Sequence, residues 1–266
     1  MSIYPASMLI YEQGSLRQVE GVLPVEEEIT LAVNGQDLVG LRCTPILLEE
    51  LALGFLYNEG LIEGIEDVVS VRVCGSRRCV DVWLYRDVGI PVMRTLTTGC
   101  GGGTTFQDWK EAHPPLESDL IVTPAQVIRL MRRLQDAAVL HRQARGVHAS
   151  ALAEGETLLQ VAEDVGRHNT VDKLAGLCLR QGQSLRDRIL LTTGRISSEM
   201  LVKAARMGIP VVVSLSSPTS LSVEMARLWN IALIGYARGN RFHVYTSPHR
   251  LSLPHPDVQG EKTDEQ

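Results

Sequence analysis

The chain of 266 residues is 44% hydrophobic and 21% charged, and it carries a net charge of −5. It is long enough for one large domain or two modest ones, each with a buried core. No apolar run reaches the length that crosses a bilayer, and aromatic residues, at 5%, are too few for a nucleic-acid surface built on base stacking. The first residues lack a basic and apolar leader, so we expect a cytoplasmic protein that binds neither membrane nor nucleic acid.

The charge is divided unevenly along the chain. Residues 1–65 hold ten acids and two arginines, a balance of −8, whereas residues 186–250 hold nine lysines and arginines and three acids, a balance of +6. A basic C-terminal half suits a ligand that bears phosphate. The same charges could also lie on solvated helix faces, so the asymmetry alone identifies no ligand.

The N-terminal region reads as strands with one helix. Asn34-Gly35 separates two runs of strand-forming residues, which predicts a β-hairpin. Thr44-Pro45 is typical of a helix start, with Thr44 as the N-cap and Pro45 at the first helical position, and this helix is expected to end near Gly60. Strands are predicted over residues 28–33, 37–42, 68–73 and 80–85.

Four of the five cysteines are assigned no central role. The odd number and scattered positions of the five cysteines predict no disulfide framework. Cys43 and Cys178 have apolar neighbours and are expected in the core. Cys74 and Cys79 flank a turn, where they could bind metal or resolve a persulfide on another cysteine. A zinc site needs about four ligands, and no second pair has suitable spacing, so we expect no metal site.

Cys100 is the candidate catalytic residue. It follows Gly99 and precedes three more glycines, which free the backbone and let it approach a ligand closely. Backbone N–H groups of such a loop can gather around an anion such as a thiolate. The pattern therefore predicts a reactive thiol on a loose tether; the alternative is an incidental thiol in a glycine-rich turn.

Beyond residue 118 the pattern changes to alternating strands and helices. Thr123 and Gln126 form a capping box for a helix that is expected to continue to about Arg145, and Glu154-Gly155 predicts a second hairpin. Strands are predicted over 147–152, 157–161, 189–192, 210–215, 231–236 and 241–245, and helices over 170–179, 198–207 and 220–229.

This alternation predicts an α/β fold: a three-layer α/β/α sandwich around a mixed, mainly parallel sheet, next to a β-rich N-terminal region. We expect residues 1–118 to form the N-terminal region with its helix and the Cys100 loop. Residues 119–250 form the sandwich domain, and residues 251–266 a disordered tail.

Three segments are predicted at strand ends, where open α/β sheets bind ligands: 163–168, 193–198 and 236–241. Each couples glycine with arginine, which is expected where a backbone and a guanidinium grip phosphate, although each alone could be a turn with a surface salt bridge. His168 could donate to phosphate or act as an acid, or it could cap the following helix or pair with Glu163 or Asp164. His148 is expected at the same edge.

These segments together resemble the formate dehydrogenase accessory sulfurtransferase family, usually called FdhD. The resemblance extends from residue 24 to about residue 250. It is carried by the ordered matches LGFLYNEGLI at 53–62, GCG at 99–101, EDVGRHN at 163–169, VDKL at 171–174, SSEM at 197–200 and PTSL at 218–221.

The resemblance implies a homodimer with a core similar to that of cytidine deaminases. It also implies a protein that accepts sulfur from a cysteine desulfurase as a persulfide and passes it to the molybdenum of the bis(molybdopterin guanine dinucleotide) cofactor, a bound substrate, for formate dehydrogenase. Cys100 falls at the family's persulfide cysteine. The family's cofactor-binding segment falls on Tyr236, Ala237, Arg238, Gly239, Asn240 and Arg241.

One position departs from some relatives, which carry a second cysteine three residues after the first. Here that position is Gly103. A two-thiol relay within this loop is therefore in doubt, but one thiolate can both accept and release a sulfane sulfur. We expect transfer through Cys100 alone.

Two other classes of function would place different demands on the sequence. A cofactor-binding chaperone without sulfur chemistry would need the arginines but not Cys100. A zinc deaminase would need His-x-Glu followed by Pro-Cys-x-x-Cys to hold its metal, and neither string occurs here.

Overall fold

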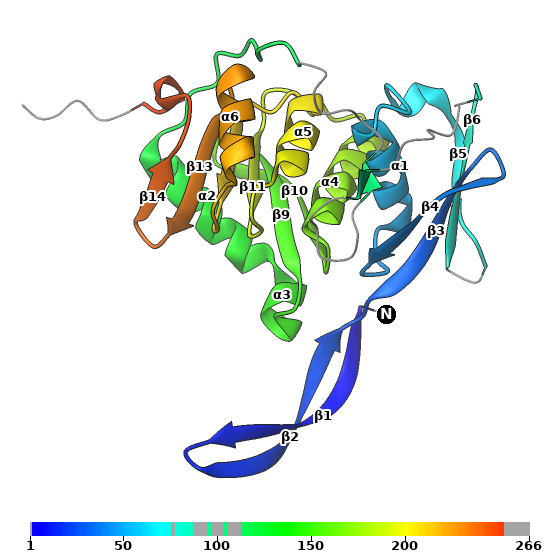
Figure 1. The fold of residues 1–266 in the computed structure, drawn as a ribbon, viewed down its shortest axis with the longest axis vertical. Coiled ribbons are helices and arrows are strands. Elements are labelled where there is room, and N and C mark those ends of the chain that lie inside the picture. Colours follow the sequence, from blue (N-terminus) through cyan, green and yellow to red (C-terminus); the bar gives the residue numbers. More distant parts are fainter. Residues whose placement is uncertain (1, 76–77, 88–94, 97–103, 106–112, 253–266) are drawn as a thin grey trace, which may run out of the picture.

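The computed structural model describes residues 2–75, 78–87, 95–96, 104–105 and 113–252. A six-stranded sheet occupies the C-terminal half and a four-stranded sheet the N-terminal half, and a two-stranded ribbon extends away from both (Figure 1). In these parts of the chain no helix is long and apolar enough to cross a membrane.

The six-stranded sheet consists of β9 (His148–Glu154), β10 (Thr157–Asp164), β11 (Ile189–Thr192), β12 (Val211–Ser214), β13 (Ala232–Arg238) and β14 (Arg241–Val244). Its strand order is β10-β9-β11-β12-β13-β14. Helical crossovers make β11, β12 and β13 parallel, as predicted. The other three pairings are antiparallel, so the sheet is mixed but not mainly parallel. Tight turns join β9 to β10 and β13 to β14, and β9 runs opposite to β11, so these three pairings are antiparallel.

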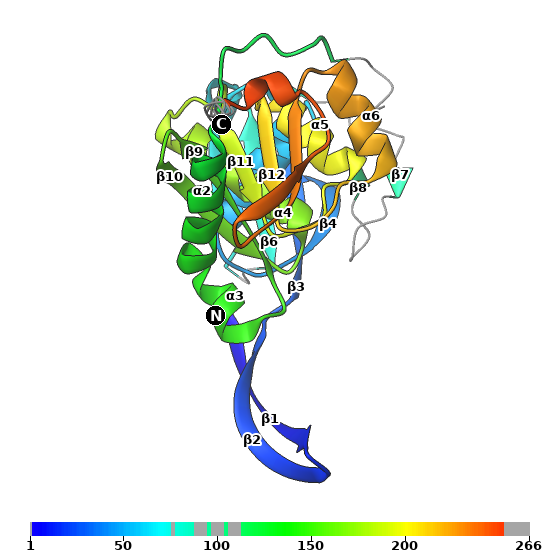
Figure 2. The same cartoon turned by 90° about the vertical axis from the view of Figure 1, so that its left-hand side faces the viewer.

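Helices cover both faces of this sheet and complete a three-layer sandwich (Figure 2). Apolar side chains of α2 (Pro124–Ala137), among them Leu130 and Leu134, pack on one face. Leu174, Leu201 and Met225 from the later helices pack on the other. The likeness to a cytidine deaminase core stays a prediction. The helices are α2 (Pro124–Ala137), α3 (Val139–Ala144), α4 (Arg167–Gln181), α5 (Ser198–Arg206) and α6 (Ser220–Leu228).

The capping box at the start of α2 is confirmed, because the Thr123 and Gln126 side chains each accept a hydrogen bond from the other's backbone N–H. The predicted single helix to Arg145 is wrong, since α2 ends at Ala137 and α3 begins anew. The Glu163 carboxylate accepts hydrogen bonds from the backbone N–H groups of Leu140 and His141, at 2.9 and 2.7 Å. A side chain distant in sequence therefore caps the second helix.

The N-terminal sheet has the order β4-β3-β6-β5 and carries α1 against one face. Its hairpin at Asn34-Gly35 is confirmed. The helix does not begin at Thr44-Pro45; its N-cap is Leu47, and Thr44 instead binds the end of β10 through Asp164 and Val165. The elements are β3 (Glu27–Val33), β4 (Gln36–Cys43), α1 (Leu48–Asn58), a 3-10 turn (Ile65–Asp67), β5 (Val68–Val73) and β6 (Cys79–Leu84).

Helices α1 and α4 join the two halves of the molecule at very short range. A Cβ atom added at Gly54 would lie 1.7 Å from the backbone oxygen of Asp172, and one added at Gly176 would lie 1.9 Å from that of Glu50. Only glycine fits at either position, because any side chain would overlap the facing backbone.

Buried ion pairs follow the same junction. Lys173 lies 2.5 Å from Asp164 with both side chains fully buried, and its Nζ also donates to the Thr44 carbonyl. Lys203 lies 2.7 Å from Asp172 and 3.4 Å from Glu59. Buried charges are costly unless paired, so these contacts fix how the halves meet.

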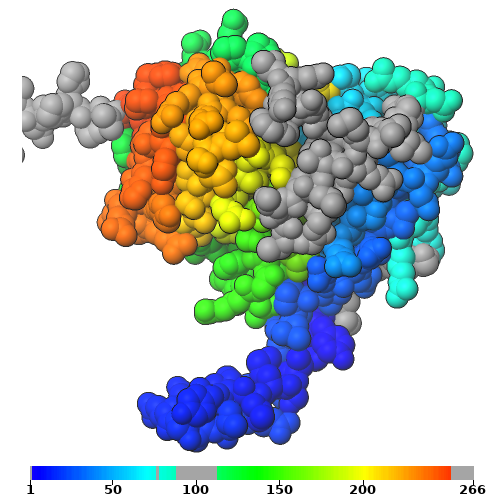
Figure 3. Space-filling view, viewed as in Figure 1, coloured from blue at the N-terminus to red at the C-terminus, as the bar shows by residue number. Residues whose placement is uncertain are grey.

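Strands β1 (Ile3–Glu12) and β2 (Ser15–Pro24) form a ribbon that the sequence analysis did not predict. Figure 3 shows this ribbon standing clear of the body. At the other end of the described chain, Arg250 donates a 2.7 Å hydrogen bond to the Ser118 carbonyl, and Leu251, assigned above to the tail, is buried. Residues 253–266 lie outside the described residues.

Candidate functional site

The predicted catalytic thiol, Cys100, lies outside the described residues, as does Gly103. On either side of them, β7 (Thr95–Leu96) pairs antiparallel with β8 (Thr104–Thr105), with Leu96 opposite Thr104. The residues that flank the glycine-rich segment are therefore paired with each other.

One edge of the six-stranded sheet collects the three glycine- and arginine-containing segments. β10 and β11 both run antiparallel to β9, so they point the same way, and β12 and β13 run parallel to β11. The carboxyl ends of these four strands consequently meet at one edge, with the first residue of β9, His148, among them. The structure thus brings the three segments and His148 together, as expected.

Buried hydroxyl groups hold the loops of this edge in place. Ser150 lies 2.6 Å from the Thr170 hydroxyl and donates to Thr192 at 2.9 Å, while Ser214 donates to the Gly194 carbonyl at 2.6 Å. These residues were not among the predicted site residues. Their signal is present, because Thr192 and Ser214 are the polar last residues of otherwise apolar strands. A polar side chain at such a position needs a partner at the strand end.

A cationic group lies at the start of α4. Arg167 is the first residue of this helix and is only 5% exposed. Burial lowers the pKa of the half-buried His148, and the charge of Arg167 lowers it further. Gly194 lets the next loop approach, since a Cβ there would lie 2.9 Å from the Arg167 Cβ and 3.3 Å from the His148 Nδ1. The edge is thereby tightly packed around the guanidinium of Arg167, a cationic group of the kind that suits an anionic ligand.

His168 pairs with a residue that was not expected. Its Nε2 lies 2.9 Å from the Glu199 carboxylate and 3.2 Å from the Ser197 hydroxyl, both near the start of α5. The expected partners are engaged elsewhere, Glu163 at α3 and Asp164 at Lys173. The contact ties α4 to α5.

The predicted cofactor segment, residues 236–241, comprises the end of β13, the turn at Gly239-Asn240 and the first residue of β14. Tyr236 has a φ of 52° and is 42% exposed, and the strand register shifts between Gly235 and Arg238. A tyrosine in the left-handed region is uncommon and is often held for a functional reason.

Contacts with neighbouring elements hold this segment in position. The Tyr236 ring lies 5.2 Å from that of His243, and Arg238 donates its Nε–H to the Leu215 carbonyl at 2.9 Å. Asn240 accepts a 2.6 Å hydrogen bond from Arg132, while Arg241 is exposed and Ala237 buried.

The four cysteines in the described residues play other parts. Cys43 and Cys178 are free and buried, as expected, and burial raises their pKa to about 12 and about 11. Cys74 and Cys79 are joined in a disulfide across the β5–β6 hairpin. Among the described side chains, no group of three or more His, Cys, Asp or Glu residues is placed to hold a metal ion.

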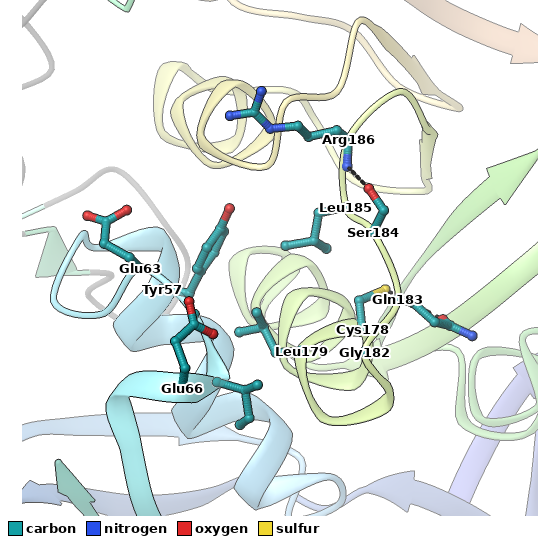
Figure 4. Close-up of a pocket in the computed structure, with 12 residues that line it drawn as sticks. Tyr57, Glu63, Glu66, Cys178, Leu179, Gly182, Gln183, Ser184, Leu185 and Arg186 are labelled. Atoms are coloured by element: carbon teal, nitrogen blue, oxygen red, sulfur yellow. Dashed lines mark hydrogen bonds between the residues drawn. The ribbon is translucent and has the colours of Figure 1, made fainter. Parts of the chain in front are cut away.

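A cavity of about 320 Å³ lies elsewhere, between the ends of α1 and α4 (Figure 4). Tyr57, Glu63 and Glu66 line one side of it, and Leu185 and Arg186 line the other. The cavity opens at the C-terminal end of α4, a helix of 15 residues and so about 22 Å long, whose N-terminal end carries Arg167. It is therefore distinct from the sheet edge.

Comparison with known proteins identifies the family. The FdhD/NarQ family model matches residues 24–252. The chain belongs to the FdhD/NarQ family. Among curated FdhD relatives, the sulfur carrier protein FdhD of Bacillus subtilis (strain 168) is 38% identical over 248 residues, which cover 91% of this chain and 94% of that protein. The sulfur carrier protein FdhD of Staphylococcus haemolyticus (strain JCSC1435) is 36% identical over 251 residues, covering 92% and 95%.

A solved structure agrees with this membership. The crystal structure of a proposed formate dehydrogenase accessory protein from Desulfotalea psychrophila superposes with a TM-score of 0.80 at 26% identity, covering 95% of this chain and 100% of that one. The mixed α/β architecture is therefore shared with a protein named as a formate dehydrogenase accessory protein. The resemblance to the FdhD family expected from the sequence is confirmed.

Proposed function

We propose that this protein is a sulfurtransferase that carries sulfur on Cys100 for the maturation of formate dehydrogenase. The observation that carries the proposal is the pair of relatives named sulfur carrier proteins, 36–38% identical over more than nine-tenths of the chain. The glycine-flanked Cys100 is the thiol whose sequence surroundings best suit that role, since two others are buried with raised pKa and two are paired.

The loading of Cys100 would proceed as thiol–persulfide exchange. The Cys100 thiolate attacks the outer sulfur of a persulfide on a cysteine desulfurase, forming a new S–S bond while the desulfurase thiolate leaves. The recipient is the molybdenum of the bis(molybdopterin guanine dinucleotide) cofactor, bound as a substrate. Because Cys100 must be reduced to act, a cytoplasmic location fits.

The sheet edge is the proposed binding region for that cofactor. Its diphosphates would meet the positive charge around Arg167, and its nucleotide ends would meet the segment from Tyr236 to Arg241, where Arg241 is exposed. The mixed polar and aromatic surface there suits a base and a sugar. We further propose that the protein acts as a homodimer.

The experiment that tests sulfur carriage is mass spectrometry of the protein and of its peptides. After incubation with a cysteine desulfurase and cysteine, the protein is expected to gain the mass of one sulfur atom on the peptide that contains Cys100. Cys100→Ser should gain none, while the control Cys178→Ser should gain the same mass as the parent protein. Loading that does not depend on Cys100 would overturn the proposal.

A chaperone without sulfur chemistry is the second candidate. It is favoured by the positively charged sheet edge, which is built from residues other than Cys100. It requires that Cys100→Ser protein support formate dehydrogenase as well as the parent protein does.

A further inference from the structure

Exposed arginines follow the outer side of α2 and α3, which lie along one side of the molecule in Figure 2. Residues 124–145 contain five arginines and one acid, Asp136, and all six of these residues are exposed. The apolar side chains of α2 pack against the sheet, so the charged side of the helix is the one that a partner can meet. The arginines are Arg129, Arg132, Arg133, Arg142 and Arg145.

Four of these arginines form no ion pair with a described carboxylate, whereas Arg129 pairs with Glu156 at 2.6 Å. Three of the four donate to neutral oxygens. These contacts join Arg132 to the Asn240 amide at 2.6 Å, Arg133 to the Glu156 carbonyl, and Arg142 to the carbonyls of Gln135 and Asp136. Such contacts hold a guanidinium in place and leave its charge uncompensated. We call Arg132, Arg133, Arg142 and Arg145 the basic face.

Exposed arginines in the N-terminal half have different surroundings. Arg17, Arg42 and Arg86 have side chains that are 59% or 60% exposed, and each lies 3.6 or 3.7 Å from a carboxylate. Their charges are therefore balanced locally. The basic face is by contrast a local excess of positive charge in a chain whose net charge is −5.

The basic face borders the sheet edge proposed to bind the cofactor. Arg132 reaches the segment 236–241 through Asn240, and Glu163, near the end of β10, caps the start of α3. Measured along the helices, the stretch from residue 132 to residue 145 is about 20 Å long, which is longer than a diphosphate. The basic face therefore suits a broad acidic surface better than one small anion.

Nucleic acid and membrane fit the basic face less well. Residues 124–145 contain no aromatic residue that could stack on a base. Val127, Leu130 and Leu134 of α2 are buried, so they are not available to enter a bilayer. An acidic protein surface requires neither feature, because complementary charge is sufficient to attract and orient it.

We propose that the basic face binds an acidic surface of formate dehydrogenase, the recipient in the function proposed above, on which this inference rests. A cofactor that passes from one protein to another crosses their interface, so the recipient has to dock beside the cofactor-binding edge. The basic face adjoins that edge. Opposite charges across such an interface speed association and fix orientation.

The test measures binding to formate dehydrogenase apoenzyme, which lacks its molybdenum cofactor, by biolayer interferometry at about 0.05 M and about 0.5 M salt. The basic-face variant combines Arg133→Gln, Arg142→Gln and Arg145→Gln and keeps Arg132, which contacts the cofactor segment. It should raise the Kd at least about tenfold at the lower salt, chiefly through slower association. The effect should shrink at the higher salt, where the charges are screened.

The control variant combines Arg17→Gln, Arg42→Gln and Arg86→Gln. It removes the same amount of positive charge from positions that are balanced by neighbouring carboxylates. Its Kd should stay within about twofold of that of the parent protein. Circular dichroism verifies that both variants are folded, and both should load sulfur on Cys100 as the parent protein does.

The possible outcomes separate this inference from the proposed function. Equal affinity of the basic-face variant and the parent protein overturns the inference while the proposed function stands. Equal weakening in both variants also overturns it, because net charge would then be the cause. Binding to a cysteine desulfurase or a DNA duplex that is lost in the basic-face variant, with apoenzyme binding unchanged, assigns the face to that partner and overturns the inference.

A parent protein that binds the apoenzyme at neither salt concentration overturns the inference as well. Sulfur carriage is then judged separately, by mass spectrometry of Cys100.

Discussion

The described cysteines show how local surroundings divide one kind of side chain among different tasks. Cys43 and Cys178 are fully buried, and the loss of hydration raises the pKa of each thiol far above neutral pH. A thiol that stays protonated is a poor nucleophile. These two residues therefore fill the core and do not compete with Cys100 for sulfur.

At His148 the same physics predicts a pH dependence of stability. Burial and the charge of Arg167 lower the pKa of His148 in the folded protein below its ordinary value of 6.5. As the pH falls below about 6.5, the unfolded chain takes up a proton at this residue more readily than the folded chain, so the free energy of unfolding decreases. His148→Asn should lose less stability than the parent protein between about pH 7.5 and about pH 5.5.

Urea unfolding at the two pH values measures this difference. His249→Asn, at an exposed position, is the control and should follow the parent protein. An identical loss of stability in His148→Asn and the parent protein would show that His148 protonates equally in both states.

Thr44 illustrates where residue-level prediction stops. Thr-Pro before an apolar run is a sound helix signal, yet the Thr44 hydroxyl accepts a hydrogen bond from the backbone of Val165, and its N–H donates to Asp164. Those partners lie about 120 residues away in the sequence. A cap can be predicted from neighbouring residues, but a tertiary contact that replaces it cannot.

At the scale of elements, the junction of α1 with α4 depends on two glycines. Gly54→Ala would drive a methyl group into the Asp172 carbonyl, 1.7 Å away before any shift. We expect it to lower the free energy of unfolding by about 3 kcal/mol, even though alanine is otherwise favoured in helices.

The matched control is Gly75→Ala, where an added Cβ meets no atom within 4 Å. It should change stability by less than about 0.5 kcal/mol. Urea titration followed by circular dichroism gives both values. A Gly54→Ala protein as stable as the parent would mean that the helices can separate freely, contrary to their close packing.

Local pattern was sufficient for most elements and failed where the deciding contact is distant or absent. The strands from β9 to β13 and helices α4, α5 and α6 could be predicted because each buries apolar side chains. β14, which is mostly exposed, could be predicted from the turn at Gly239-Asn240 before it. The break between α2 and α3 was missed because the Glu163 carboxylate causes it. The β1–β2 ribbon was missed because its side chains face solvent on both sides, which leaves only the turn at Gln13-Gly14 as a signal.

For the whole molecule, the main result of folding is that segments up to about 75 residues apart meet at one sheet edge. Topology explains this, since four strands end there in the same direction. The three segments could be predicted from glycine and arginine at strand ends. The polar ends of β11 and β12 are visible in the sequence, but the partners of these hydroxyl groups are not, because they lie in other strands, in α4 and in a loop.

We expect this edge to bind a guanine nucleotide, the chemical end group of the proposed cofactor. Arg238→Gln with Arg241→Gln should weaken binding of guanosine diphosphate about tenfold or more, since each charged contact to phosphate contributes about 1.5–3 kcal/mol. Calorimetry measures the affinity. Arg227→Gln, at an exposed position of α6, is the control. Undiminished binding in the double variant would move the nucleotide to another surface.

The most direct measurement of the central claim is formate dehydrogenase activity in cells that lack their own sulfur carrier. The intact chain should restore the activity, and Cys100→Ala, present in equal amount, should restore little or none. Cys178→Ala should behave like the intact chain. Full restoration by Cys100→Ala would contradict sulfur carriage and leave the chaperone role in its place.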